Sequence, residues 1–166
     1  MKNLFLFIAF LSISTLSLSA QKNLNISVQG SLPFPRETNN LYTHGIEAGI
    51  SYHTYVYENL MLGGSTGYGQ LFGETIASFT DQADIVIEDY SYIPVLVSAK
   101  VYAVNQLFLN LQPGYAFALG DDLESSFMFR ANAGYNLIEN LDLFLSYQFL
   151  LKSEEPMVGL GLNFYP

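Results

Sequence analysis

The sequence predicts an all-β fold, an eight-stranded antiparallel up-and-down transmembrane β-barrel, on three observations. Apolar side chains alternate with small or polar ones along eight segments, which is the two-residue period of a β-strand. Charged residues make up 13% of the chain and apolar types 50%, so the exterior is poorly suited to water. Beyond the N-terminus there is no run of about 20 apolar residues, which leaves a closed barrel as the structure that satisfies its backbone in lipid.

Residues 1–20 have the composition of a secretory signal peptide. Lys2 supplies the positive start, residues 4–11 the apolar centre and residues 12–20 a small-residue exit. We expect cleavage near Ala20, so that residues 21–166 form the outer-membrane barrel domain. With Lys2 removed, 5 Lys and Arg stand against 15 Asp and Glu, a balance of −10. This sign argues against nucleic acid as a partner.

The hairpin of residues 125–152 shows the strand pattern most clearly. Its two strands meet at a tight turn, Glu139-Asn140, and each has one apolar face. The other face is mostly Gly, Ser, Asn and Gln, with the apolar exceptions Met128, Phe144 and Leu150. A water-facing strand would carry many Lys and Glu there. We therefore assign the apolar face to lipid and the small polar face to the lumen of a barrel.

The same alternation predicts the other strands in order. We expect strands at about residues 24–32, 43–57, 60–72, 90–104, 107–117, 127–137, 141–151 and 158–164. Pro94 removes a ladder donor from the fourth strand, which predicts a bulge or an interrupted ladder beside it. The connections at 58–59, 105–106 and 139–140 are tight, and the others are mostly longer or acidic. This arrangement is typical of an outer-membrane barrel with periplasmic turns, and an even number of strands places both termini in the periplasm.

Three segments carry a resemblance to a known family: YIPVL at 92–96 before KVY at 100–102, QPGY at 112–115, and VGLGLNF at 158–164. They resemble the small outer-membrane β-barrel proteins, porin-like or OmpX-like, of Bacteroidetes-type bacteria. The resemblance covers essentially the whole mature chain and implies a location in the cell outer membrane, without catalytic residues. Members of this family usually end in an aromatic residue that the barrel-assembly machinery recognises, whereas here Tyr165 and Pro166 follow Phe164.

Four charged residues have the inward parity, meaning that they fall on the alternating positions of a strand that face the lumen. They are Glu47, Lys100, Arg130 and Asp142. A charge that faces a barrel interior is costly unless it is paired. We expect a lumen ion-pair network, with Glu47 beside Arg130 nearer the outside and Lys100 beside Asp142 nearer the periplasm. Because eight strands leave room for little but side chains, this network favours a structural plug over a conducting path.

The lumen-facing side of the expected strand 43–57 contains Glu47, Ser51 and His53, which are the residue types of a hydrolase catalytic site. Side chains two residues apart on one strand are roughly 7 Å apart, too far for Ser51 to pass its proton to His53. A lipid-cleaving site would also have to open toward the membrane. We therefore expect a hydrogen-bonded interior histidine, no catalytic residue and no enzyme activity.

Eleven of the 15 acids lie in the presumed outer loops. They are Glu37, Glu74, Asp81, Asp84, Glu88, Asp89, Asp121, Asp122, Glu124, Glu154 and Glu155. Such oxygens could bind calcium or magnesium, but no segment has the fixed spacing of a calcium loop, and we expect solvated loops that repel one another. The absence of cysteine excludes disulfides and Cys-ligated metal. We expect no cofactor.

Aromatic residues predict two girdles at the membrane surfaces. Tyr68, Phe117, Phe127 and Phe149 lie toward the outer loops, and Tyr135 and Phe164 toward the periplasm. The structural rival is a soluble secreted barrel of lipocalin type, with the faces exchanged and a hydrophobic ligand inside. The face of Gly, Ser, Asn and Gln lacks the Lys and Glu of a water-exposed surface, which decides against this rival.

The favoured function is a structural or surface-interaction barrel whose lumen is filled by side chains. A narrow pore for small solutes is the second hypothesis, and a lipid-modifying outer-membrane enzyme is the third. The expected partners are outer-membrane lipid, lipopolysaccharide and the barrel-assembly machinery. An envelope protein partner is left open by the sequence.

Overall fold

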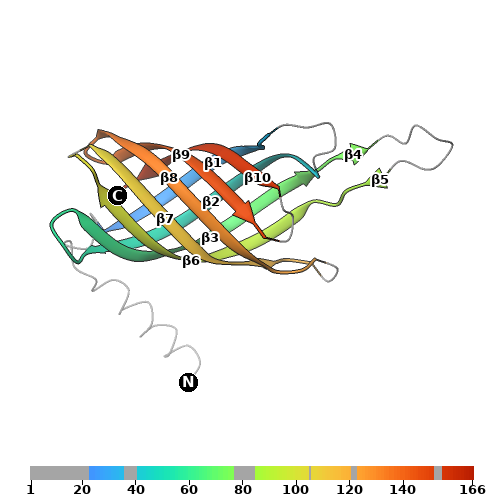
Figure 1. The fold of residues 1–166 in the computed structure, drawn as a ribbon, viewed down its shortest axis with the longest axis horizontal. Helices are drawn as coiled ribbons and strands as arrows, with labels where there is room; N and C mark the ends of the chain where they lie inside the picture. The colour runs from blue at the N-terminus through green and yellow to red at the C-terminus, as the bar shows by residue number, and fades with distance from the viewer. Residues whose placement is uncertain (1–22, 36–40, 77–84, 105, 121–122, 152–154) are drawn as a thin grey trace, which may run out of the picture.

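The computed structural model describes residues 23–35, 41–76, 85–104, 106–120, 123–151 and 155–166. The expected signal peptide, residues 1–20, lies outside these residues. Eight long strands close a barrel in the order β1-β10-β9-β8-β7-β6-β3-β2 (Figure 1). They are β1 (Leu24–Pro33), β2 (Tyr42–Tyr55), β3 (Leu60–Gly73), β6 (Tyr90–Tyr102), β7 (Leu107–Ala118), β8 (Ser126–Ile138), β9 (Leu141–Leu150) and β10 (Pro156–Phe164). The predicted eight-stranded antiparallel fold is confirmed.

A short hairpin extends the barrel at the end opposite the tight turns. It consists of β4 (Thr75–Ile76) and β5 (Ile85–Val86), which form a separate two-stranded sheet. In Figure 1 it projects beyond the strands of the barrel, between β3 and β6. In the expected order of strands, this stretch falls in the connection between about residues 72 and 90. Within the described residues, no helix is long and apolar enough to cross a membrane.

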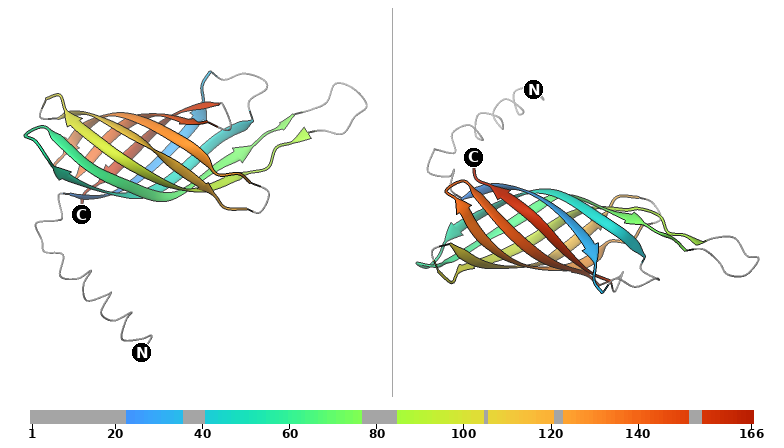
Figure 2. Two further views of the ribbon diagram at one scale, coloured as in Figure 1. Left: turned by 60° about the horizontal axis from the view of Figure 1, so that its bottom comes forward. Right: turned by 90° about the horizontal axis from the view of Figure 1, so that it is seen from above.

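The barrel closes where its first and last strands pair. The register runs from Ile26 opposite Phe164 to Pro33 opposite Met157. The backbone N–H of Tyr165 donates to the carbonyl of Asn140, 2.9 Å away, in the tight turn between β8 and β9. The start of β1 and the end of β10 therefore lie at the end of the barrel that carries the tight turns, the turn end, as Figure 2 also shows. The opposite end is the loop end.

The two faces of each strand have the expected composition. Most of the large apolar side chains point outward, with Val97 67% and Leu160 59% exposed, while Ser98 and Asp142 inside the lumen are 0% exposed. A soluble lipocalin-type barrel would gather its large apolar side chains in the centre, because water would surround it. The arrangement of the faces excludes that rival.

The outward aromatic residues lie near the two ends of the strands. Tyr68, Phe117 and Phe127 are exposed toward the loop end, and Tyr135 and Phe164 toward the turn end. Phe149 also has the outward parity and is partly exposed. These positions are those that the two predicted girdles require.

Pro94 interrupts the ladder between β3 and β6. Pairing stops after Thr66 with Val95 and resumes at Gly69 with Tyr92, without a change of register. The predicted interrupted ladder is thus confirmed, and no bulge accompanies it. A second interruption, which the sequence analysis did not predict, lies between β6 and β7 in the stretch that contains Pro113. Proline has no N–H to donate, which accounts for both positions.

Three inward aromatic rings lie over glycines of the neighbouring strand. The pairs are Tyr92 with Gly69, Phe108 with Gly134 and Phe144 with Gly161. A Cβ atom on any of these glycines would lie 2.2–2.3 Å from the Cζ atom of the ring opposite. Glycine is therefore required for the rings to lie flat inside a narrow barrel.

An apolar cluster closes the loop end of the lumen. It consists of Leu71, Tyr90, Tyr92, Leu96, Ala116, Met128, Leu150 and Met157. Tyr42, Ala118 and Leu123 pack against it. Met128 and Leu150 were apolar exceptions on the inward face of the sequence pattern, and the cluster explains them. The lumen is thus apolar toward the loops and polar toward the turns.

Candidate functional site: the polar lumen

An upper belt of polar side chains lies directly below the apolar cluster. Arg130 Nη2 of β8 lies 2.5 Å from Glu47 Oε2 of β2, across the lumen. The hydroxyl of Tyr92 donates to the same carboxylate oxygen at 2.9 Å. Gln148 accepts from Arg130 Nη2 at 3.2 Å and donates to the Tyr92 oxygen at 3.0 Å. Each charge is thus hydrogen-bonded to more than its ionic partner, which a buried ion pair requires.

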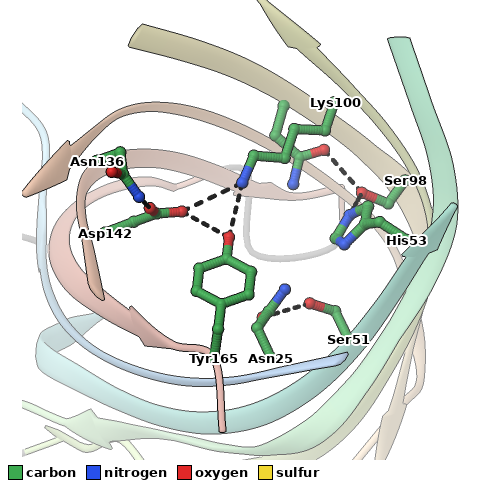
Figure 3. Close-up of polar contacts among 9 residues, drawn as sticks. Asn25, Ser51, His53, Ser98, Lys100, Asn136, Asp142 and Tyr165 are labelled. Carbon is green, nitrogen blue, oxygen red and sulfur yellow. Dashed lines mark hydrogen bonds and ion pairs between the residues drawn. The ribbon is translucent and has the colours of Figure 1, made fainter. Parts of the chain in front are cut away.

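A lower triangle lies nearer the turns (Figure 3). Lys100 Nζ of β6 lies 3.2 Å from Asp142 Oδ2 of β9 and donates to the Tyr165 hydroxyl at 2.8 Å. Tyr165 in turn donates to Asp142 Oδ2 at 2.6 Å, and Asn136 donates to Oδ1 at 2.9 Å. The Phe108 ring covers the ammonium group at 3.8 Å, a cation–π contact. Lys100 and Asp142 are fully enclosed, with 2% and 0% exposed.

Tyr165 lies just beyond the last strand, and its side chain returns into the lumen. Burial raises the pKa of its phenol, and the negative charge of Asp142 raises the pKa further. The phenol therefore stays protonated. It donates a hydrogen bond to the Asp142 carboxylate and accepts one from the Lys100 ammonium group. This places the end of the chain in the hydrogen-bond network of the lumen.

The structure brings together both pairs that the sequence analysis named, Glu47 with Arg130 and Lys100 with Asp142. Glu47 and Arg130 lie toward the loops and the other pair toward the turns, in the expected order. Tyr92 and Tyr165 were not expected as partners of these charges. Tyr92 has the inward parity and could have been found from it, whereas Tyr165 follows the last strand and no alternation locates its side chain.

His53 is hydrogen-bonded to Ser98 rather than to Ser51. His53 Nε2 lies 2.7 Å from Ser98 Oγ (Figure 3). The Ser98 hydroxyl donates to Asn110 Oδ1 at 2.7 Å. Since a hydroxyl has one proton, His53 must donate from Nε2, so it is not positioned to deprotonate Ser98. Ser51 donates to Asn25 at 2.6 Å. The prediction of a hydrogen-bonded interior histidine is confirmed.

Two cavities follow one another along the polar half of the lumen. A small inner cavity of about 30 Å³ is lined by polar side chains that include Gln29, Arg130 and Asn132. An open cavity of about 850 Å³ at the turn end is lined by Tyr55, Tyr102, Tyr165 and the tight turns, among others. His53 and Lys100 line both cavities. The two cavities therefore adjoin at these two buried side chains, and the open cavity lies on the turn side.

The acidic loop residues are described only in part. Glu37, Asp81, Asp84, Asp121, Asp122 and Glu154 lie outside the described residues. Of the others, Asp89 accepts from Gln70 and from the backbone N–H of Gly73, both at 3.0 Å, and so joins the loop ends of β3 and β6. In the part of the chain that the structure describes, no group of three or more His, Asp or Glu side chains could hold a metal ion.

The fold is similar to that of solved transmembrane barrels. A de novo designed transmembrane β-barrel superposes with a TM-score of 0.59 at 17% identity, covering 86% of this chain and 94% of that one. The Yersinia pestis outer membrane protein Ail in a phospholipid nanodisc gives 0.56 at 16% identity, covering 86% and 97%. Crystalline Ail with the heparin analogue sucrose octasulfate gives 0.51 at 15%, covering 86% and 96%. No protein-family model matches the sequence, and no curated protein matches it.

Proposed function

We propose that the chain is an integral outer-membrane barrel of a Gram-negative bacterium, with a structural or surface-interaction role. Its apolar exterior is the main support, because side chains such as Val97 and Leu160 are more than half exposed around a closed barrel. In lipid this surface is favourable, and closure leaves no strand edge with unpaired backbone groups. The similarity to Ail and to designed transmembrane barrels agrees with this role. Membership of the OmpX-like family remains part of the proposal.

The observation that carries a structural role, rather than transport, is the closure of the lumen. The apolar cluster lies above the Glu47–Arg130 belt, and Tyr92 and Met128 within the cluster are 1% and 0% exposed. An ion would have to pass packed apolar side chains and then break a buried ion pair. A barrel of eight strands is just wide enough to be filled in this way.

Planar-bilayer recording tests the closed lumen. We expect the purified barrel, reconstituted from detergent, to insert without stepwise conductance, while a general porin prepared in the same way conducts. Steady single-channel steps from the wild-type protein would instead favour the pore. The observations that favour this second function are the open cavity at the turn end and the polar lower lumen.

The proposed orientation places the turn end in the periplasm and the loop end outside the cell. The chain contains no cysteine, so single introduced cysteines can be labelled without background. We expect Glu88→Cys, beside the outer hairpin, to react with an impermeant maleimide on intact cells. Tyr57→Cys, in a tight turn, should react only after the outer membrane is permeabilised. The reverse pattern would contradict the orientation.

A surface-interaction role would depend on the charge of the loops. One solved Ail structure holds the heparin analogue sucrose octasulfate, a polyanion. The sequence puts eleven acids in the presumed outer loops of this chain, with Arg36 and Lys152 as the cations of the same segments. Lys100 and Arg130 are buried in the lumen. Repulsion should therefore exclude such a ligand. Isothermal titration with sucrose octasulfate is expected to give no binding heat, and a saturable signal would contradict this.

The proposal includes contacts with outer-membrane lipid and lipopolysaccharide, insertion by the barrel-assembly machinery, and no catalytic role. Ser51 and His53 each have another hydrogen-bond partner, which supports the last point. Purified protein should release no fatty acid from lipid A. Release that disappears in His53→Ala would overturn the non-enzymatic assignment.

A further inference from the structure

Three residues that line the inner cavity each carry a buried polar atom with no hydrogen-bond partner among the described residues. These atoms are Arg130 Nε, Gln29 Oε1 and Asn132 Oδ1, and each is enclosed by the barrel. Buried polar atoms of this kind are uncommon, because each forfeits the hydrogen bonds that water gave it. All three residues border the same cavity of about 30 Å³. A partner common to these three residues would therefore occupy this cavity.

The surrounding network determines which atoms of the two amides remain unpaired. Gln29 Nε2 donates to Gln148 Oε1 at 3.4 Å, and the same oxygen accepts from Arg130 at 3.2 Å. If the oxygen and nitrogen of the Gln29 amide were exchanged, its oxygen would face the Gln148 oxygen and the hydrogen bond would be lost. Asn132 Nδ2 donates to Gln112 Oε1 at 3.1 Å, and the same argument holds. Both amides therefore present a carbonyl oxygen without a partner, while Arg130 presents an N–H.

We propose that the inner cavity binds an ordered water molecule between Arg130, Gln29 and Asn132. One N–H donor and two carbonyl acceptors match a water molecule, which accepts one hydrogen bond and donates two. An alkali cation would be repelled by the guanidinium group, and a halide by the two carbonyl oxygens. The volume suits one or two water molecules, given that about 10–15 Å³ suffices for one.

Among the described residues, the open cavity at the turn end adjoins the inner cavity. His53 and Lys100 line both the inner cavity and the open cavity, so they stand between the two. The apolar cluster blocks the loop end. Water would therefore approach the inner cavity from the turn end, past His53 and Lys100, whatever the role of the barrel in the envelope.

Nuclear magnetic resonance of the full barrel in nanodiscs tests the site. In 15N-labelled wild-type protein, the Arg130 Nε–H resonance should show cross-relaxation to water with the negative sign of an immobilised molecule. Gln29→Met removes one acceptor at similar volume and should abolish this cross-peak. The matched control is Gln70→Met, because Gln70 lies at the loop end and does not line the cavity. The cross-peak should remain in the control.

Two results would overturn the proposal. One is a wild-type Arg130 Nε–H without a bound-water cross-peak, or with a cross-peak that Gln29→Met leaves unchanged. The other is a shift of this resonance when sodium chloride is replaced by caesium chloride or sodium bromide, which would identify an ion in the cavity. Both wild-type measurements remain decisive if Gln29→Met fails to fold.

Discussion

Lys100 and Asp142 are a buried ion pair in which each residue needs the other. Both are almost inaccessible to solvent, and Tyr165, Asn136 and the Phe108 ring complete their surroundings. Removing one member leaves an uncompensated charge, whereas removing both leaves a neutral site. The stability of the lumen therefore depends on the match between the two residues more than on either charge.

The first prediction concerns this pair. Lys100→Met should lower the free energy of unfolding by about 3–5 kcal/mol, since it leaves Asp142 buried and unpaired. The double variant Lys100→Met/Asp142→Leu should regain most of that loss. Urea titration in lipid vesicles, followed by the electrophoretic shift of the folded barrel, measures both. Equal losses in the single and double variants would contradict the pairing argument.

A second prediction concerns Tyr165. Tyr165→Phe removes the hydroxyl that joins Lys100 to Asp142 and should cost about 1.5–3 kcal/mol, the range for a hydrogen bond to a charged group. Tyr57→Phe, in a turn and 73% exposed, is the matched control and should leave stability unchanged. The same urea titration compares the two. Equal stability of Tyr165→Phe and wild type would remove Tyr165 from the network.

The strands of this barrel are joined by side-chain packing as well as by their ladders. Phe108 of β7 lies over Gly134 of β8 and also covers the ammonium group of Lys100 on β6. One glycine thus provides the space for a ring that contacts the lower triangle. Tyr92 over Gly69 connects β6 with β3 in the same way and supports the upper belt.

The third prediction follows from this packing. Gly134→Ala should destabilise the barrel by about 1–3 kcal/mol, because the added methyl group would meet the Phe108 ring and displace it. Gly30→Ala is the control, since a Cβ atom there would meet its nearest neighbour at 4.0 Å. It should change stability by less than about 0.5 kcal/mol. Equal effects of the two substitutions would mean that the ring adapts without cost.

At the scale of the whole molecule, the barrel is inverted relative to a soluble protein. Large apolar side chains cover its exterior, and its ion pairs lie within. Lipid tails are favourable surroundings for such an exterior, and a closed ladder satisfies the backbone there. The same exterior in water would promote aggregation.

The fourth prediction tests the lipid-facing exterior. Val97 points outward near the middle of β6 and is 67% exposed. Val97→Arg should cost about 2–4 kcal/mol in lipid vesicles, the range for a cation at the bilayer midplane. Tyr57→Arg, in the turn, should cost at most about 1 kcal/mol. Folding titrations in vesicles compare them, and a cost-free Val97→Arg would mean that this face does not meet hydrocarbon.

Much of the polar lumen could be predicted because a strand has a strict two-residue period. Parity alone assigned Glu47, Lys100, Arg130 and Asp142 to the interior, and their distances from the turns indicated which would meet. Ser98 as the partner of His53 could not be predicted. The two lie on β2 and β6, which do not pair with each other, and contact depends on how the inner side chains pack.

The sequence by itself determined the eight strands, the face that each turns outward and the charges that face the lumen. These follow from local alternation and turn chemistry, which need no knowledge of distant residues. Only the tertiary structure decided that the apolar cluster closes the loop end, that Tyr165 returns into the lumen, and that three residues with unpartnered polar atoms line one cavity. Those features depend on side chains from strands that meet only when the barrel closes.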